Sequence, residues 1–162
     1  MQINEATRAD WPLIYPFWRE IVAAGESYAY PDGLSREEAE PWWMEMPPGH
    51  TVVAVEPDGT VLGSAKMGPN RPGRGAHIAT ASFMVDPRFA GRGVGRALGS
   101  YVLTWAKEGG YHGIQFNAVV ETNEAAMHLW QSLGFRLLAT VPEAYDHRLF
   151  GRVGLNVLYR NV

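Results

Sequence analysis

The segment VDPRFAGRGVGRA, residues 85–97, constrains the fold most, because it joins an apolar strand pattern to a helical pattern through glycines at every second position. Val94, Leu98 and Val102 continue the helical spacing after the turn. Glycine has no Cβ, so the main chain of such a turn can lie close to a ligand. The first N–H groups of a helix have no partner inside the helix, and together with the helix dipole they favour an anion. The segment therefore predicts a strand–turn–helix unit with an anion site at the start of the helix.

Two arginines in this turn strengthen the prediction. Arg92 and Arg96 are four residues apart and are expected on one side of the helix. A cation in the first helical turn is unfavourable by a few tenths to about 1 kcal/mol, so both are expected to face a bound anion. The alternative, a glycine-rich turn with solvated arginines, stays open at this point. Walker and dinucleotide motifs are excluded, because no Lys-Ser or Lys-Thr pair follows the glycines and Leu98 stands where a fingerprint starting at Gly93 has Gly or Ala.

The rest of the chain alternates strand and helix patterns, which favours an α/β or α+β fold. Strands are predicted over residues 1–5, 51–55, 61–67, 77–85, 113–120, 135–141 and 155–160. Helices are predicted from a capping box at 7–10 to residue 24, from a second capping box at 35–38 to residue 43, from the glycine turn to residue 108, and from residue 123 to residue 133. An aromatic and charged loop is expected between the last two strands. Leu13 in the first helix and Phe116 and Ala118 in their strand are expected in the core. No linker divides the pattern, so residues 1–162 are expected to form one domain.

The composition narrows the function. The chain has no cysteine, which excludes disulfides, a thiolate nucleophile and cysteine-ligated zinc, and no metal site is expected. The net charge of −3 argues against a general nucleic-acid binder, yet six of the 14 basic residues lie between Lys66 and Arg96, with Asp86 as the one acid. A positively charged segment of this kind can form a binding site for a polyanion of modest size. With no leader pattern and no apolar run of about 20 residues, we expect a cytoplasmic protein without a membrane partner.

Two stretches resemble motifs of the GNAT (GCN5-related) N-acetyltransferases. The run from Arg92 to Leu98 is similar to motif A, Q/R-x-x-G-x-G/A, whose main-chain N–H groups bind the CoA pyrophosphate, although the leading Gln or Arg falls at Ala90. Residues 123–135, NEAAMHLWQSLGF, resemble motif B, N-x-x-A-x-x-L-Y-x-x-x-G-F. Taken alone, the second stretch could be an ordinary capped core helix. Its position about 30 residues after motif A makes the resemblance to the family much more specific. Trp130 stands where the family often has a tyrosine that protonates the CoA thiolate, and an indole N–H is not an acid at neutral pH.

The resemblance implies an α+β fold of the three-layer GNAT type. Its central mixed, mostly antiparallel sheet has six or seven strands with helices on both faces, and it is splayed between the strands at 77–85 and 113–120. The implied activity is an N-acetyltransferase that moves the acetyl group of acetyl-CoA, as co-substrate, directly to a primary or secondary amine. The implied cofactor-binding residues are Phe83, Met84, Val85, Arg92, Gly93, Val94, Gly95, Arg96, Ala97, Asn123 and Trp130.

The acceptor side is less sharply marked. Asn117 lies mid-strand, where a buried amide must be hydrogen-bonded, and it is expected to hold the thioester oxygen or the acceptor unless it is structural. By resemblance, the loop at 25–30 covers the acceptor, with Glu26 as the ammonium partner or base and Tyr28 and Tyr30 as walls. A merely solvated Glu26 is the alternative. Tyr145, between the last strands, is a second candidate wall.

Three functions stay open at this stage. A weaker resemblance in GESYAY, QFNAVVETN and VPEAY points to small-molecule GNATs that acetylate amino acids or their toxic analogues. A non-catalytic CoA-binding sensor or interaction domain is the first alternative, motivated by Ala90 and Trp130. A protein N-acetyltransferase is the second. The resemblance also allows a homodimer, which many GNATs form.

Overall fold

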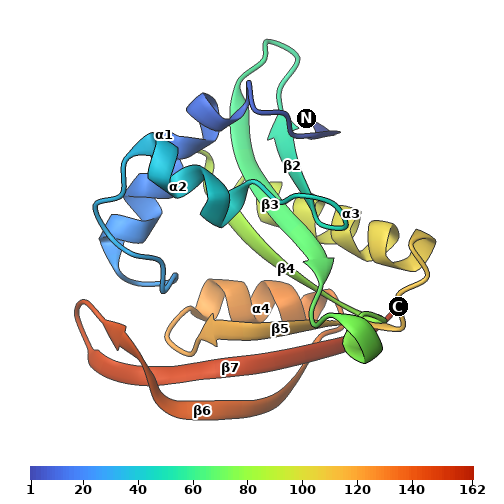
Figure 1. Cartoon of the computed structure of the whole chain (residues 1–162). Helices are drawn as coiled ribbons and strands as arrows, with labels where there is room; N and C mark the ends of the chain where they lie inside the picture. Colours follow the sequence, from blue (N-terminus) through green and yellow to red (C-terminus); the bar gives the residue numbers. More distant parts are fainter.

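The computed structural model describes residues 1–162, whose seven strands form one open sheet in the order β1-β2-β3-β4-β5-β7-β6 (Figure 1). The only parallel neighbours are β4 and β5. The predicted mixed, mostly antiparallel sheet is therefore confirmed. The strands are β1 (Gln2–Glu5), β2 (His50–Val55), β3 (Val61–Pro69), β4 (Ile78–Val85), β5 (Gly113–Val120), β6 (Arg136–His147) and β7 (Gly151–Asn161).

Helices cover both faces of the sheet, as predicted. One face packs against α1 (Trp11–Ala24) and α2 (Arg36–Trp43), with Trp11, Phe17, Trp18 and Trp43 in the buried cluster between them. The other face packs against α3 (Val94–Glu108) and α4 (Glu124–Ser132), around a separate cluster that includes Leu98 and Trp130. None of the four helices has the length and apolarity needed to cross a membrane.

The two predicted capping boxes have different outcomes. At α2 the Ser35 hydroxyl accepts the Glu38 N–H at 3.2 Å, and the Glu38 carboxylate accepts the Ser35 N–H at 2.9 Å, so this box is confirmed. The first box is wrong. The Asp10 carboxylate accepts the N–H and hydroxyl of Thr7, at 2.7 and 2.8 Å, and α1 begins only at Trp11. The helix starts there because a proline in the first turn has no N–H to leave unpaired. Leu13 then faces solvent, which corrects its predicted core position.

The sheet opens between β4 and β5. These strands pair only at Ile78 with Gly113 and at Ala79 with Ile114, and they diverge beyond that point. The predicted splay is thus confirmed. On the other side of β5, the register with β7 shifts between Phe116 and Val119. Because a register shift changes which face a side chain occupies, Ala118 is exposed and does not continue the buried face of Phe116.

The last two strands are longer than their sequence pattern predicts. Tyr145, assigned to a loop, lies in β6 and pairs with Val153 of β7. The pairing is irregular between Val141 and Tyr145, around Glu143 with its positive φ of 52°. The residues at this irregularity have the sequence pattern of a loop. In the structure, β6 nevertheless resumes its pairing with β7 beyond it.

Candidate active site

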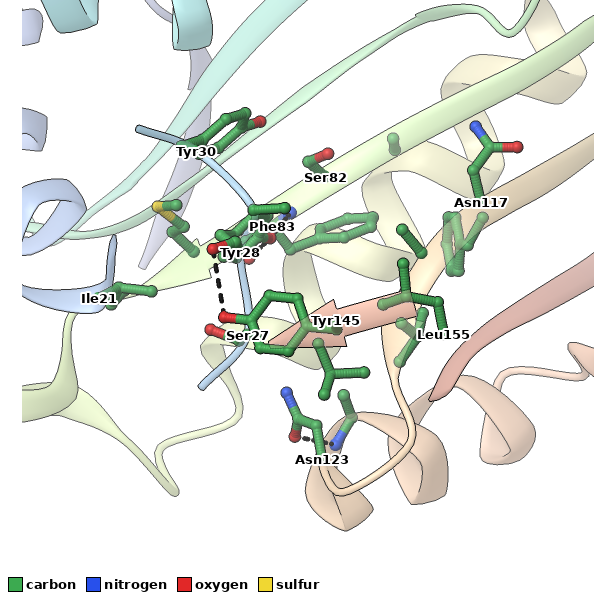
Figure 2. Close-up of a pocket in the computed structure, with 18 of the residues that line it drawn as sticks. Ile21, Ser27, Tyr28, Tyr30, Ser82, Phe83, Asn117, Asn123, Tyr145 and Leu155 are labelled. Atoms are coloured by element: carbon green, nitrogen blue, oxygen red, sulfur yellow. Dashed lines mark hydrogen bonds between the residues drawn. The ribbon is translucent and has the colours of Figure 1, made fainter. Parts of the chain in front are cut away.

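A cavity of about 500 Å³ fills the opening between β4 and β5 (Figure 2), and we call it the splay cavity. Its walls are mostly apolar and come from the α1–α2 loop, β4, β5, α4 and the final hairpin. The residues used below are Tyr28, Tyr30, Phe83, Val85, Phe116, Asn117, Asn123, Trp130 and Tyr145. A cavity that five segments share is a suitable place for two reactants to meet.

The free edge of β4 supplies main-chain groups to this cavity. On the β3 side, Asp86 donates its N–H to Leu62 and Ile78 accepts from Asn70, at 3.0 and 2.7 Å. Successive residues of a strand point their N–H and C=O groups to opposite sides. The odd-numbered residues Ala81, Phe83 and Val85 therefore turn these groups toward the splay, where β5 has moved away. An extended ligand can pair with this edge as an additional strand does.

The glycine turn lies directly after this edge. Gly91 and Gly93 have φ values of +77° and +78°, and a Cβ added to either meets no atom within 4 Å. The six consecutive N–H groups from Gly91 to Arg96 donate no hydrogen bond within the protein. Open space at Gly91 and Gly93, beside six unused donors at a helix start, suits a diphosphate, the kind of anion that the sequence predicts here.

The arginines of the turn do not behave alike. Arg92 forms an ion pair with Glu56 at 2.7 Å, so the expectation that it lacks a counter-charge is wrong. Glu56 lies 36 residues earlier in the chain, which is why the local pattern gave no sign of it. Arg96 donates only to the neutral Ser132 hydroxyl, at 2.8 Å. The anion site thus depends on the main-chain donors and on Arg96 more than on Arg92.

Asp86, which the sequence did not single out, fixes the approach to the turn. Its side chain is 1% exposed and accepts hydrogen bonds from the N–H, Nε and Nη2 of Arg88, at 2.9, 3.0 and 2.5 Å. Burial raises the pKa of the Asp86 carboxyl, but the hydrogen bonds and charge of Arg88 outweigh it and hold the pKa below its ordinary value. Arg88 is therefore already paired and is not a free cation beside Ala90.

Three residues of the motif B stretch, Asn123, Ala126 and Trp130, line the splay cavity. Asn123 caps α4 by accepting the Ala126 N–H at 3.1 Å. Trp130 is buried, with its ring centroid 4.5 Å from that of Phe83 and 4.9 Å from that of Phe116. The three aromatic rings form an apolar wall against the β4 edge.

A second hollow of about 470 Å³, the side cleft, shares Tyr30, Ser82 and Asn117 with the splay cavity. Its charged lining residues, Glu45 and Lys66, form an ion pair at 3.0 Å. The Lys66 ammonium also donates to the Trp42 carbonyl at 2.8 Å and lies 5.7 Å from the Tyr30 ring centroid. No motif marks these residues, and only the pairing of Lys66 with Ser82 across β3 and β4 brings them to the site.

Asn117 lies where the two hollows meet, on the far side of Phe83 from Tyr28 in Figure 2. Its amide donates to Asn70 at 2.7 Å and to Thr80 at 3.4 Å, and it accepts from Gln115 at 2.8 Å. The prediction of a buried amide is wrong, because the β5 register shift leaves Asn117 exposed.

The predicted acceptor residues come together only in part. The Phe83 N–H donates to the Tyr28 hydroxyl at 3.0 Å, and that hydroxyl donates to the Phe83 carbonyl. The Tyr145 hydroxyl donates to the Tyr28 carbonyl at 3.3 Å, the dashed line in Figure 2. Burial, and then the charge of Glu26, raise the pKa of Tyr145. Glu26 is exposed and lines neither hollow.

Comparisons with known proteins agree with this geometry. Residues 15–135 match the sequence model of the acetyltransferase (GNAT) family. The chain is 35% identical over 145 residues to the L-amino acid N-acyltransferase MnaT of Escherichia coli, covering 88% of this chain and 84% of that protein. It superposes with a TM-score of 0.95 and 58% identity on a GCN5-related N-acetyltransferase from Kribbella flavida, over 99% of this chain and 97% of the other. The yncA protein of Salmonella typhimurium, solved with its cofactor acetyl-CoA, has a TM-score of 0.85 and 25% identity over 99% and 93% of the two chains.

Proposed function

This chain belongs to the acetyltransferase (GNAT) family, and we propose that it transfers the acetyl group of acetyl-CoA directly to the amine of a small molecule, an amino acid or an analogue of one. The similarity to MnaT, which is named an L-amino acid N-acyltransferase, supports this acceptor class. The absence of cysteine is consistent with direct transfer, since a cysteine acyl-enzyme has no nucleophile here.

The observation that carries the proposal is the connection of two hollows through one opening in the sheet. At one end, the N–H groups from Gly91 to Arg96 are free to hold a pyrophosphate. At the other end, the side cleft offers a polar entry that meets the splay cavity at Ser82 and Asn117. Direct transfer needs both substrates in one cavity at the same time, and this arrangement provides it.

Each of the residues around the two hollows has its own role in the proposed reaction. The main chain of Val85 and the carbonyl of Phe83 hold an extended pantetheine chain along the β4 edge, and Trp130 packs beneath its thiol end. Bound acetyl-CoA supplies a thioester that is activated toward attack by an amine. Asn117 orients the acceptor at the junction of the hollows, beside Tyr30. Glu26 is proposed to take the ammonium proton through water, from its exposed position near Tyr145.

The test is an acceptor screen. The purified chain is mixed with acetyl-CoA and with amino acids, polyamines, aminoglycosides or peptides, and free thiol is measured over time. We expect steady multiple turnover with at least one free amino acid or analogue, and none when its amine is already acetylated. Binding of CoA without turnover on any acceptor would instead support a sensor or interaction domain. Turnover with peptides alone would support protein acetylation.

A further inference from the structure

The Tyr28 hydroxyl occupies the middle of the free β4 edge. It accepts the Phe83 N–H at 3.0 Å and donates to the Phe83 carbonyl, 55 residues along the chain. No strand covers this part of β4, because pairing with β5 ends at Ala79. An oxygen that accepts a main-chain N–H at an uncovered edge, inside the splay cavity, lies where the carbonyl oxygen of a ligand would lie.

Packing holds the Tyr28 ring beside this edge. The ring stacks on Tyr30 with centroids 5.4 Å apart and planes 9° apart, and it meets Trp43 edge-on at 6.2 Å. The Tyr28 carbonyl is held separately by the Tyr145 hydroxyl. If the Tyr28 hydroxyl moves away by about one hydrogen-bond length, roughly 3 Å, it frees the Phe83 N–H and still reaches the oxygen that replaces its own.

We propose that Tyr28 is a catalytic residue whose hydroxyl joins the Phe83 N–H in an oxyanion hole, and that in the free protein its oxygen occupies the place of the thioester oxygen. The inference rests on the proposed function. As the acceptor nitrogen bonds to the carbonyl carbon, the electron pair of the C=O bond moves onto the oxygen, where the two donors stabilise it. When the pair returns, the C–S bond breaks and the thiolate leaves with its electrons. The attacking nitrogen, positively charged since it bonded to the carbonyl carbon, then loses its extra proton to solvent.

The protonation of Tyr28 suits a hydrogen-bond donor better than an acid. Burial raises the pKa of the Tyr28 hydroxyl, with Tyr30 adding to the effect and the bond to Phe83 opposing it. A phenol of raised pKa stays neutral at working pH and gives up its proton reluctantly. Tyr28 therefore does not replace the tyrosine that is absent at Trp130 as a proton donor, and it acts on the oxygen rather than on the sulfur.

Tyr28→Phe tests the proposal, because it removes the hydroxyl and keeps the ring. The turnover number is expected to fall about a hundredfold, the lower end of the range seen when one oxyanion donor is removed. The affinity for acetyl-CoA, measured by calorimetry, is expected to stay equal or to rise, because the hydroxyl no longer competes for the Phe83 N–H. With acetyl-CoA labelled with ¹³C at the carbonyl, the C=O stretch of the bound thioester is expected at a higher frequency than in the wild type.

Tyr15→Phe is the matched control. The Tyr15 hydroxyl donates to the Leu34 carbonyl at 2.8 Å in the same aromatic cluster, and Tyr15 lines neither hollow. Turnover, affinity and carbonyl frequency are expected to stay at the wild-type values. An unchanged turnover or carbonyl frequency in Tyr28→Phe overturns the proposal, and so does a weaker acetyl-CoA affinity. If no acceptor supports turnover, the C=O stretching frequency of bound acetyl-CoA and its affinity, compared between Tyr28→Phe and Tyr15→Phe, still test the role of Tyr28. A wild-type chain that does not bind acetyl-CoA overturns both this inference and the proposed function.

Discussion

The two ends of the proposed site, the glycine turn that follows β4 and the side cleft, offer different parts of the chain to a ligand. At the glycine turn, the available groups are main-chain N–H groups, and Gly91 and Gly93 contribute mainly by having no side chain in the way. At the side cleft, the available groups are side chains, among them Tyr30, Lys66 and Asn117 from three separate segments. We therefore expect ligand binding at the first end to depend on added side-chain volume and on Arg96, and binding at the second end to depend on the chemistry of several side chains.

The largest effect on ligand affinity is expected when a large side chain replaces a glycine of the glycine turn. Gly93→Trp is expected to lower CoA affinity at least about a hundredfold, because it places a ring before the free N–H groups and forces a side chain into a left-handed conformation that costs about 1–2 kcal/mol. Calorimetry with CoA measures the loss. Gly110→Trp is the control, since Gly110 has a φ of +74° with open space and lies beyond the other end of α3. Equal affinity in the two variants would contradict the placement of the pyrophosphate.

The next largest effect is expected at Asp86. This residue sharpens the comparison, because its side chain fixes the approach to the glycine turn, where the available groups are main-chain N–H groups. Asp86→Asn is expected to destabilise the fold by about 1–3 kcal/mol at neutral pH, since buried hydrogen bonds to Arg88 are lost. The pKa of Asp86 lies below its ordinary value of 3.8, so its contribution is present above that pH and is lost as pH falls through the lower folded pKa. The gap in Tm between wild type and variant should close over that window.

Asp58→Asn is the control for this prediction. Asp58 also has a lowered pKa, from hydrogen bonds with Thr60, but it lies exposed in the β2–β3 turn. Its replacement is expected to change stability by less than about 0.5 kcal/mol. A Tm gap for Asp86→Asn that does not depend on pH would mean that shape, and not the ionised carboxylate, fixes the turn.

The same contrast explains what the sequence could predict. The glycine turn, the Ser35 capping box and the start of α3 depend on rules that act within a few residues, so spacing was enough to predict them. The side cleft and the Tyr28 contact join segments far apart in the chain, and no local rule reports which ones meet. Asn117 shows the limit most clearly: the sequence placed it mid-strand with a buried amide, but the register shift between β5 and β7 leaves it exposed.

A substitution of Asn117 tests the region where the splay cavity meets the side cleft. Asn117→Ala is expected to lower turnover about tenfold, the effect of losing roughly 1.4 kcal/mol of hydrogen bonding, while CoA affinity changes less than about twofold. Asn161→Ala is the control, because that exposed amide donates to Tyr159 and lies outside both hollows. Unchanged turnover in Asn117→Ala would remove Asn117 from the catalytic residues and leave it as a structural link between Asn70 and Thr80.

The smallest effect concerns the charge of the side cleft. If the acceptor is an amino acid, its carboxylate is expected near Lys66, the cation among the lining residues, with Glu45 beside it for the ammonium. Because the ion pair is partly exposed, Lys66→Met should change stability by less than about 1 kcal/mol and raise the acceptor KM only about threefold. The discriminating measurement compares a free amino acid with its amide, whose carboxyl group carries no charge. A rise in KM for the acid alone would show that Lys66 acts through its charge. An equal rise for both would show that it acts through shape, and the side cleft would then resemble the glycine turn in responding to volume.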